Sequence, residues 1–116
     1  MTKAEERGEL LRIFIGESDR WERKPLYEAI VLAAREADLA GATVLRGVMG
    51  YGRHSRVHTA KILRLSEDLP IVIEIADRTD KIEAFLPTVD RMVTEGLVTL
   101  ETVRVLKYRG GEAAAP

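Results

Sequence analysis

The chain has 116 residues and a formal net charge of −1 at pH 7, with 18 lysines and arginines against 19 acids. This balance excludes a protein that binds polyanions with its whole surface, so electrostatic arguments have to be local. The absence of cysteine excludes disulfides, thiolate metal sites and a cysteine nucleophile. The charged N-terminal segment lacks a signal-peptide core, and no apolar run approaches the roughly 20 residues that span a bilayer. We therefore expect a cytoplasmic protein without membrane insertion.

The first half of the chain carries the patterns of two strands and one helix. Residues 1–9 are mostly polar and are expected to form a flexible N-terminus. Leu10–Ile15 alternates in the manner of a strand. A helix is expected between Pro25, which suits a first helical turn, and Gly41, which suits a helix end. Thr43–Met49 follows as a second strand.

The second half carries a strand, a helix and another strand. Pro70–Ala76 is rich in isoleucine and valine and is expected to be the third strand. The helix after it is indicated by the capping-box pair in Asp80–Glu83 and an apolar stripe, and it is expected to stop at Gly96. Leu97–Tyr108 is the fourth strand, and residues 110–116 form a disordered tail.

The expected order βαββαβ, with two right-handed crossovers, gives an α+β, ferredoxin-like fold. Its four-stranded antiparallel sheet carries both helices on one face, and residues 10–109 form a single domain. Strands one and three are central, and strand two pairs with strand three. Residues 50–69 then become a long hairpin connection, and a connection of this length is usually functional or disordered.

The sheet face away from the helices is expected to be partly apolar. Alternation places Arg12, Glu74 and Arg46 on it, as an Arg–Glu–Arg row across neighbouring strands. The valines expected there are Val44 or Val48, Val72, and Val103 or Val105. Because an uncovered sheet face of this kind favours association, we expect an oligomer.

The segment GVMGYGRHSRVHTAKILR contains three closely spaced glycines, Gly47, Gly50 and Gly52. These glycines have two interpretations. They allow a strand to end in a bulge with a sharp exit, or they let the backbone approach a phosphate closely. No helix follows them directly, so they do not form a dinucleotide-binding fingerprint.

The same segment is basic, and no acid occurs between Gly41 and Ser66. Such a cluster attracts a phosphate, a carboxylate or an acidic partner. The alternatives are a solvated loop, or pairing with acids such as Glu67 and Asp68 of a neighbouring subunit. The bases and histidines concerned are Arg53, His54, Arg56, His58, Lys61 and Arg64.

Metal binding, catalysis and nucleic-acid binding are not expected. His54 and His58 have the spacing of a helical metal-binding pair, but the neighbouring arginines would repel a cation. Ser18 and Asp19 do not complete a nucleophile, a base and an orienting acid. An RNA-binding sheet of this fold needs aromatic side chains on both central strands, and Pro70–Ala76 has none.

Four phrases of the sequence resemble an uncharacterised prokaryotic family of PII-like proteins, namely GESD-W--KPLYEAI, AGATVLRGVMGYG, HTAKILRLSEDLPIVIEI and KIEAFLP…EGLVTLE. The resemblance covers the chain from about Leu10 to Arg109. It implies a homotrimer of ferredoxin-like subunits, with the long connection in the place of the PII T-loop. In PII signalling proteins, effectors such as adenine nucleotides bind in clefts between subunits. The T-loop docks on a partner, often a transporter, a channel or an enzyme.

The resemblance also implies site residues. Gly50 and Gly52 match the place where the PII loop leaves strand two beside the nucleotide. The ending KYRGGE resembles the basic PII ending that reaches the phosphates, which makes Lys107 and Arg109 candidate ligands. PII proteins carry a Gly-rich, lysine-containing phosphate loop before the last strand, whereas VTEGLVT has one glycine and no lysine. This departure argues against ATP-type binding and leaves a different nucleotide or anion.

We therefore expect a non-enzymatic, PII-like regulator without a cofactor. Its effector site is expected to use Gly50, Gly52, Arg53, Lys107 and Arg109, with Glu17 added if its loop lies beside the glycines. The partner-docking residues are expected to be His54, Arg56, His58, Lys61 and Arg64. The alternative function is a trimeric adaptor without a small-molecule ligand, whose basic loop binds an acidic protein surface.

Overall fold

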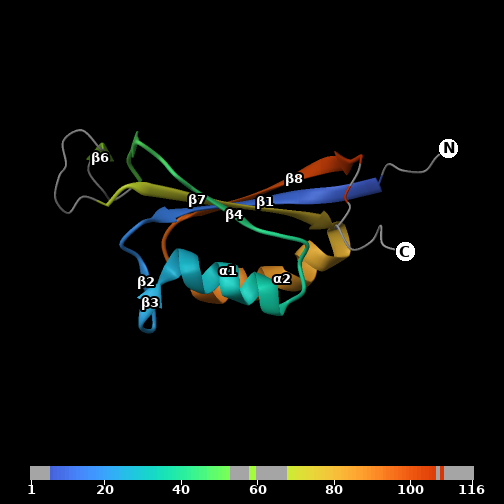
Figure 1. The fold of residues 1–116 in the computed structure, drawn as a ribbon, viewed down its shortest axis with the longest axis horizontal. Helices are drawn as coiled ribbons and strands as arrows, with labels where there is room; N and C mark the ends of the chain where they lie inside the picture. Colours follow the sequence, from blue (N-terminus) through green and yellow to red (C-terminus); the bar gives the residue numbers. More distant parts are fainter. Residues whose placement is uncertain (1–5, 53–57, 60–67, 107, 109–116) are drawn as a thin grey trace, which may run out of the picture.

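The chain folds into a four-stranded antiparallel sheet with two helices on one face (Figure 1). The computed structural model describes residues 6–52, 58–59, 68–106 and 108. In spatial order the sheet contains β4 (Thr43–Arg46), β7 (Pro70–Arg78), β1 (Glu6–Gly16) and β8 (Leu97–Val105). The helices are α1 (Leu26–Glu36) and α2 (Thr79–Met92). Two small two-stranded pairs complete the fold, β2 (Arg20–Trp21) with β3 (Lys24–Pro25) and β5 (Met49–Gly50) with β6 (His58–Thr59).

The core lies between the sheet and the helices and follows from alternation on the two central strands. On β1 and β7 every second side chain faces the helices, and Ile13 pairs directly with Ile73. One stripe of each helix covers this layer. The buried residues are Leu11, Ile13, Ile15, Leu26, Ala29, Ile30, Ala34, Ile71, Ile73, Ile75, Ile82, Phe85, Val89 and Met92. Because burial of one such large side chain stabilises by about 1.5–3 kcal/mol, this layer supplies the main driving force for folding.

This architecture confirms the predicted ferredoxin-like βαββαβ fold, including the pairing of the second strand with the third. One boundary differs, because β1 begins at Glu6 and so includes residues 6–9, which the polar composition assigned to a flexible N-terminus. The reason is that β1 is central. It pairs with β7 from Gly8 onward and with β8 from Glu6 onward. Backbone partners on both sides satisfy its amides and carbonyls whatever the polarity of the side chains.

The end of α1 also differs from the prediction, because the helix stops at Glu36 and not near Gly41. Asp38 adopts a φ of 66°, the left-handed conformation that ends a helix. The next N–H, that of Leu39, donates to the carbonyl of Ala34 at 3.1 Å. Asp38 therefore ends the helix where Gly41 was expected to end it, since Asp tolerates this conformation better than most residues do. No described helix is long and apolar enough to cross a membrane.

The sheet face away from the helices is called the open face below. The row of charged residues on it differs from the predicted row in one member. Arg12 and Glu74 lie side by side on it, with Arg12 Nε 3.0 Å from Glu74 Oε2. The prediction for Arg46 is wrong, because β4 pairs in a register that puts Arg46 opposite Ile71, on the helix side. The third member of the row is Glu101, whose Oε1 lies 3.4 Å from Arg12 Nη1. The apolar residues of the open face are Leu10, Phe14, Leu45, Val72, Ala76, Leu97, Val103 and Val105.

Candidate functional site

The candidate site begins at the end of the sheet where the chain leaves β4 toward the 50–69 connection and returns from it to β7. The turn after β1, residues 16–19, lies against the returning end. The Glu17 N–H donates to the carbonyl of Leu69 at 2.9 Å, and the Ser18 N–H donates to Asp68 Oδ1 at 2.7 Å. Two backbone donors of one short turn therefore fix the residues that lead into β7.

The same turn holds the outgoing end of the connection through a side chain. Glu17 Oε2 accepts from Arg46 Nη2 at 2.5 Å, and Arg46 directly precedes Gly47. The Gly47 N–H in turn donates to the carbonyl of Pro70 at 2.7 Å. Because the Arg46 side chain is 57% exposed, this ion pair orients the chain more than it stabilises the fold. Glu17 thus lies at the base of the connection, and its contact with a ligand remains a prediction.

Two of the glycines have a structural reason in the packing of the connection. A Cβ at Gly47 would lie 2.8 Å from Pro70 Cγ, and a Cβ at Gly50 would lie 3.0 Å from the same atom. The backbone therefore passes close over the proline ring, and a side chain at either position would crowd that ring. Gly50 also pairs with His58, so the connection starts as a narrow two-stranded ladder. The ligand contacts of Gly50 and Gly52 remain predictions.

Most of the predicted effector-site and docking side chains lie outside the described residues, namely Arg53, His54, Arg56, Lys61, Arg64, Lys107 and Arg109. His58 belongs to the short strand β6, and not to a helix of the kind that the His-x-x-x-His spacing would require. Among the described residues, no group of three or more His, Cys, Asp or Glu side chains is placed to hold a metal ion. The roles assigned to these bases therefore remain predictions.

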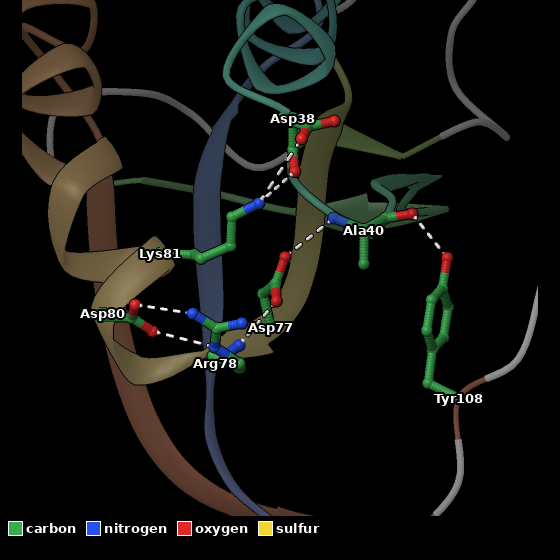
Figure 2. Close-up of polar contacts among 7 residues, drawn as sticks. All are labelled: Asp38, Ala40, Asp77, Arg78, Asp80, Lys81 and Tyr108. Carbon is green, nitrogen blue, oxygen red and sulfur yellow. Dashed lines mark hydrogen bonds and ion pairs between the residues drawn. The ribbon is translucent and has the colours of Figure 1, made fainter.

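Tyr108, which follows β8, lies at the opposite end of the sheet, beside the turn after α1 (Figure 2). The Tyr108 hydroxyl donates to the carbonyl of Ala40 at 3.1 Å. The Ala40 N–H donates to Asp77 Oδ2 at 2.8 Å, and Lys81 Nζ donates to the carbonyl of Asp38 at 2.6 Å. This turn is thereby tied to β7, to α2 and to Tyr108.

Beside this turn, Arg78 and Asp80 form an exposed ion pair with an Nη2–Oδ2 distance of 2.8 Å (Figure 2). The hydrogen bond from Arg78 lowers the pKa of Asp80, and the same bond raises the pKa of Arg78 above its ordinary value. α2 begins at Thr79 with Arg78 as its N-cap, so Asp80 lies inside the first turn. The predicted capping box of Asp80 with Glu83 is therefore wrong, because the N-cap is Arg78 and makes no side-chain capping bond.

Within one chain, Gly50 and Tyr108 lie at opposite ends of the sheet. Gly50 packs on Pro70, which pairs with Gly16 at one end of β1. β8 ends beside Glu6 at the other end of β1, and Tyr108 follows it. The nine residues of β8, at a rise of about 3.3 Å each, separate these ends by roughly 30 Å. One small ligand therefore cannot contact both Gly50 and Tyr108 of the same subunit.

The connection between α2 and β8 does not form a phosphate loop of the PII type. α2 ends at Met92 and β8 begins at Leu97, which leaves only residues 93–96 between them. Gly96 has a φ of 150°, and a Cβ there would lie 2.6 Å from the carbonyl oxygen of Phe14. This glycine is needed so that the connection can pack against β1. The short connection agrees with the sequence, which lacks the Gly-rich, lysine-containing phosphate loop of PII proteins.

Two hollows lie elsewhere on the described surface. One, of about 200 Å³, is lined by Asp19, Arg20, Leu26, Met92, Thr94 and Glu95. The other, of about 420 Å³, lies between the end of α1 and residues 38–42. Neither is lined by Gly50, Glu17 or Arg46, so both are separate from the candidate site.

The sheet order and the two helices on one face define a ferredoxin-like fold of the PII-like kind, and solved structures agree. CPII, a nitrogen regulatory PII-like protein from Thiomonas intermedia K12 bound to ADP, AMP and bicarbonate, is similar with a TM-score of 0.62. The identity is 18%, over 89% of this chain and 92% of that chain. A putative PII-like signaling protein from Thermus thermophilus has a TM-score of 0.60 and 15% identity, over 95% and 98% of the two chains. At these identities the likeness establishes the fold alone.

The chain belongs to the DUF190 family, described as Uncharacterized ACR, whose model matches residues 8–105. A UPF0166 protein from Aquifex aeolicus is 41% identical over 97 residues, which is 84% of this chain and 91% of that protein. A UPF0166 protein from Methanocaldococcus jannaschii is 31% identical over 102 residues, which is 87% of this chain and 94% of that protein. The resemblance to an uncharacterised PII-like family is thus confirmed.

Proposed function

We propose that this protein is a non-enzymatic, PII-like regulator in the cytoplasm that binds a small anionic or nucleotide effector between the subunits of a homotrimer. Its basic 50–69 connection docks a partner protein, such as a transporter, a channel or an enzyme. The observation that carries the proposal is that one turn, residues 16–19, holds both ends of this connection beside Gly47. A ligand bound at this end of the sheet acts where the connection begins and returns, and so shifts the population of its conformations.

Two features support assembly. The open face presents apolar side chains from all four strands, such as Leu45 and Leu97, which are 48% and 56% exposed in the single chain. Uncovered apolar area of this kind favours burial against another subunit. The separation of Gly50 from Tyr108 at opposite ends of the sheet gives the second reason, since a complete site then needs a neighbouring copy.

The effector class follows from what the chain offers and from a structural relative. With only residues 93–96 in the place of the phosphate loop, the phosphate contacts fall to the base of the connection and to the C-terminal bases. We assign Gly50, Gly52 and Arg53 of one subunit, with Glu17 at the edge of the site, and Lys107 and Arg109 of its neighbour. That the similar CPII structure holds ADP, AMP and bicarbonate supports an anion of this size range.

A thermal-shift assay tests the proposal, with ADP, AMP, bicarbonate and inorganic phosphate as probes. A probe that binds only the folded protein stabilises it by about 2.7 kcal/mol at a concentration about 100 times its Kd. The double variant Arg53→Ala/Arg109→Ala should lose the shift, whereas Arg91→Ala, an exposed arginine on α2, should keep it. A shift that persists in the double variant contradicts the site. A flat response to every probe, with salt-sensitive capture of an acidic protein, supports the adaptor instead.

A further inference from the structure

The centre of the open face carries a charge imbalance. Arg12 donates through Nε to Glu74 at 3.0 Å and through Nη1 to Glu101 at 3.4 Å. The hydrogen bond with Glu74, above all, raises the pKa of Arg12 above its ordinary value, so the guanidinium stays charged. One cation therefore faces two carboxylates, and the three side chains together carry one negative charge.

The other described residues of the open face do not correct this imbalance. Alternation places Glu6 and Arg78 on this face near the strand ends, one of each sign. The edge strand β4 contributes Thr43 and Leu45 there, and neither is charged. Around the Arg12 cluster the described face is otherwise apolar or uncharged, through Leu10, Phe14, Val72, Ala76, Leu97, Thr99, Val103 and Val105.

Assembly through the open face would take this cluster out of water. In the single chain the side chains are still hydrated, with Glu101 60% exposed and Glu74 33% exposed. Burial of a carboxylate that lacks a cation of its own is unfavourable, because its hydration is lost without compensation. In a symmetric oligomer every copy brings the same residues to the interface, so symmetry multiplies the excess charge and does not cancel it.

We propose that the subunits assemble through the open face with uptake of a proton at Glu101, so that assembly strengthens as the pH falls. This inference rests on the proposed homotrimer. Glu101 takes the proton because its contact with Arg12 is the longer of the two, while Glu74 keeps the short bond to the guanidinium. The direction of this pH dependence follows from linkage, because the assembled state binds more protons than the free subunits do. The extra stability of the assembled state is therefore present at low pH and is lost as the pH rises.

Sedimentation velocity over a range of protein concentrations, at about pH 5.5 and about pH 8, measures the association constant. Each proton taken up changes this constant by about tenfold per pH unit, so we expect at least about a tenfold rise for the wild type between the higher and the lower pH. Glu101→Gln removes the charge permanently. At the higher pH it should assemble at least as strongly as the wild type does at the lower pH, with little pH dependence. The matched control is Glu83→Gln, an exposed acid on α2, which should behave as the wild type.

The proposal is overturned if the wild-type constant does not change with pH, or if Glu101→Gln keeps the full pH dependence. It is also overturned if Glu83→Gln has the same effect as Glu101→Gln. A monomer at every pH overturns the homotrimer as well, whereas a trimer with a pH-independent constant overturns this inference alone. If the wild type stays assembled at the lowest measurable concentration, the rate of subunit exchange between two fluorescently labelled preparations is measured in place of the association constant. Exchange should slow as the pH falls in the wild type and in Glu83→Gln, but not in Glu101→Gln, and equal wild-type rates at both pH values refute the proposal.

Discussion

Replacement of Gly47 by alanine should destabilise the base of the connection. The added Cβ would lie 2.8 Å from Pro70 Cγ, well inside the roughly 3.5–4.0 Å at which carbon atoms pack. Neither side can move away freely, because the Gly47 N–H is bonded to the Pro70 carbonyl and Pro70 pairs with Gly16 in the sheet. Overpacking of this kind costs about 1–3 kcal/mol. For a chain of this size, the loss corresponds to a fall in Tm of about 4–12 °C.

Urea unfolding followed by the fluorescence of Trp21 measures this loss, because Trp21 is the single tryptophan and packs against the core. Gly41→Ala is the matched control, since a Cβ there meets nothing within 4 Å. We expect this control to be neutral or to gain up to about 1 kcal/mol from the restricted unfolded chain. Both variants are measured at one protein concentration, because assembly adds to the apparent stability. If Gly47→Ala unfolds at the same urea concentration as Gly41→Ala, the close contact with Pro70 does not limit the base of the connection.

Three further changes have defined outcomes. Glu17→Gln breaks the exposed pair with Arg46 and should cost less than about 1 kcal/mol of stability in thermal melts. High salt should remove this difference, and a large, salt-independent loss of stability would contradict the prediction. The lowered pKa of Asp80 means that its pair with Arg78 stabilises the fold above the ordinary carboxyl pKa, and that this contribution disappears as the pH falls through the lowered value. Asp80→Asn should therefore lower Tm at neutral pH and converge with the wild type in strong acid, whereas a constant difference across the pH range would refute the assignment. Gly96→Ala combines a φ of 150° with a clash against β1 and should cost at least about 1–3 kcal/mol in urea unfolding; an unchanged midpoint would show that the connection can repack.

The fold could be predicted because the pattern on its two central strands allows one arrangement. Alternating isoleucines on β1 and β7 leave one buried face, and the helical stripes supply its cover. The boundaries of β1 and α1 were harder to predict than the fold. Residues 6–9 are in β1 because all of them pair with β8 and, from Gly8 onward, also with β7, and a polar sequence gives no sign of that pairing. The end of α1 at Asp38 depends on a left-handed aspartate close to a glycine that would have served equally well.

The candidate site could be predicted only where chain order alone determines it. Glu17 follows the first strand, so its position at the base of the connection follows from the topology. Arg46 was missed as its partner because a shift of one residue in a short edge strand exchanges the two faces of the sheet. The bond from Tyr108 to Ala40 joins residues 68 positions apart, and no local pattern in either segment indicates it.

The most direct test of the central claim, that the effector site is shared between subunits, is calorimetric titration of ADP into mixed oligomers. Arg53→Ala and Arg109→Ala are purified separately, and each should lose binding. After subunit exchange at equal amounts, intact Arg53 of one subunit meets intact Arg109 of the next in about a quarter of the clefts of a cyclic assembly. We predict binding at wild-type affinity to that fraction of the sites. No recovery of binding in the mixture, with exchange verified by labelled subunits, would contradict a site built from two chains.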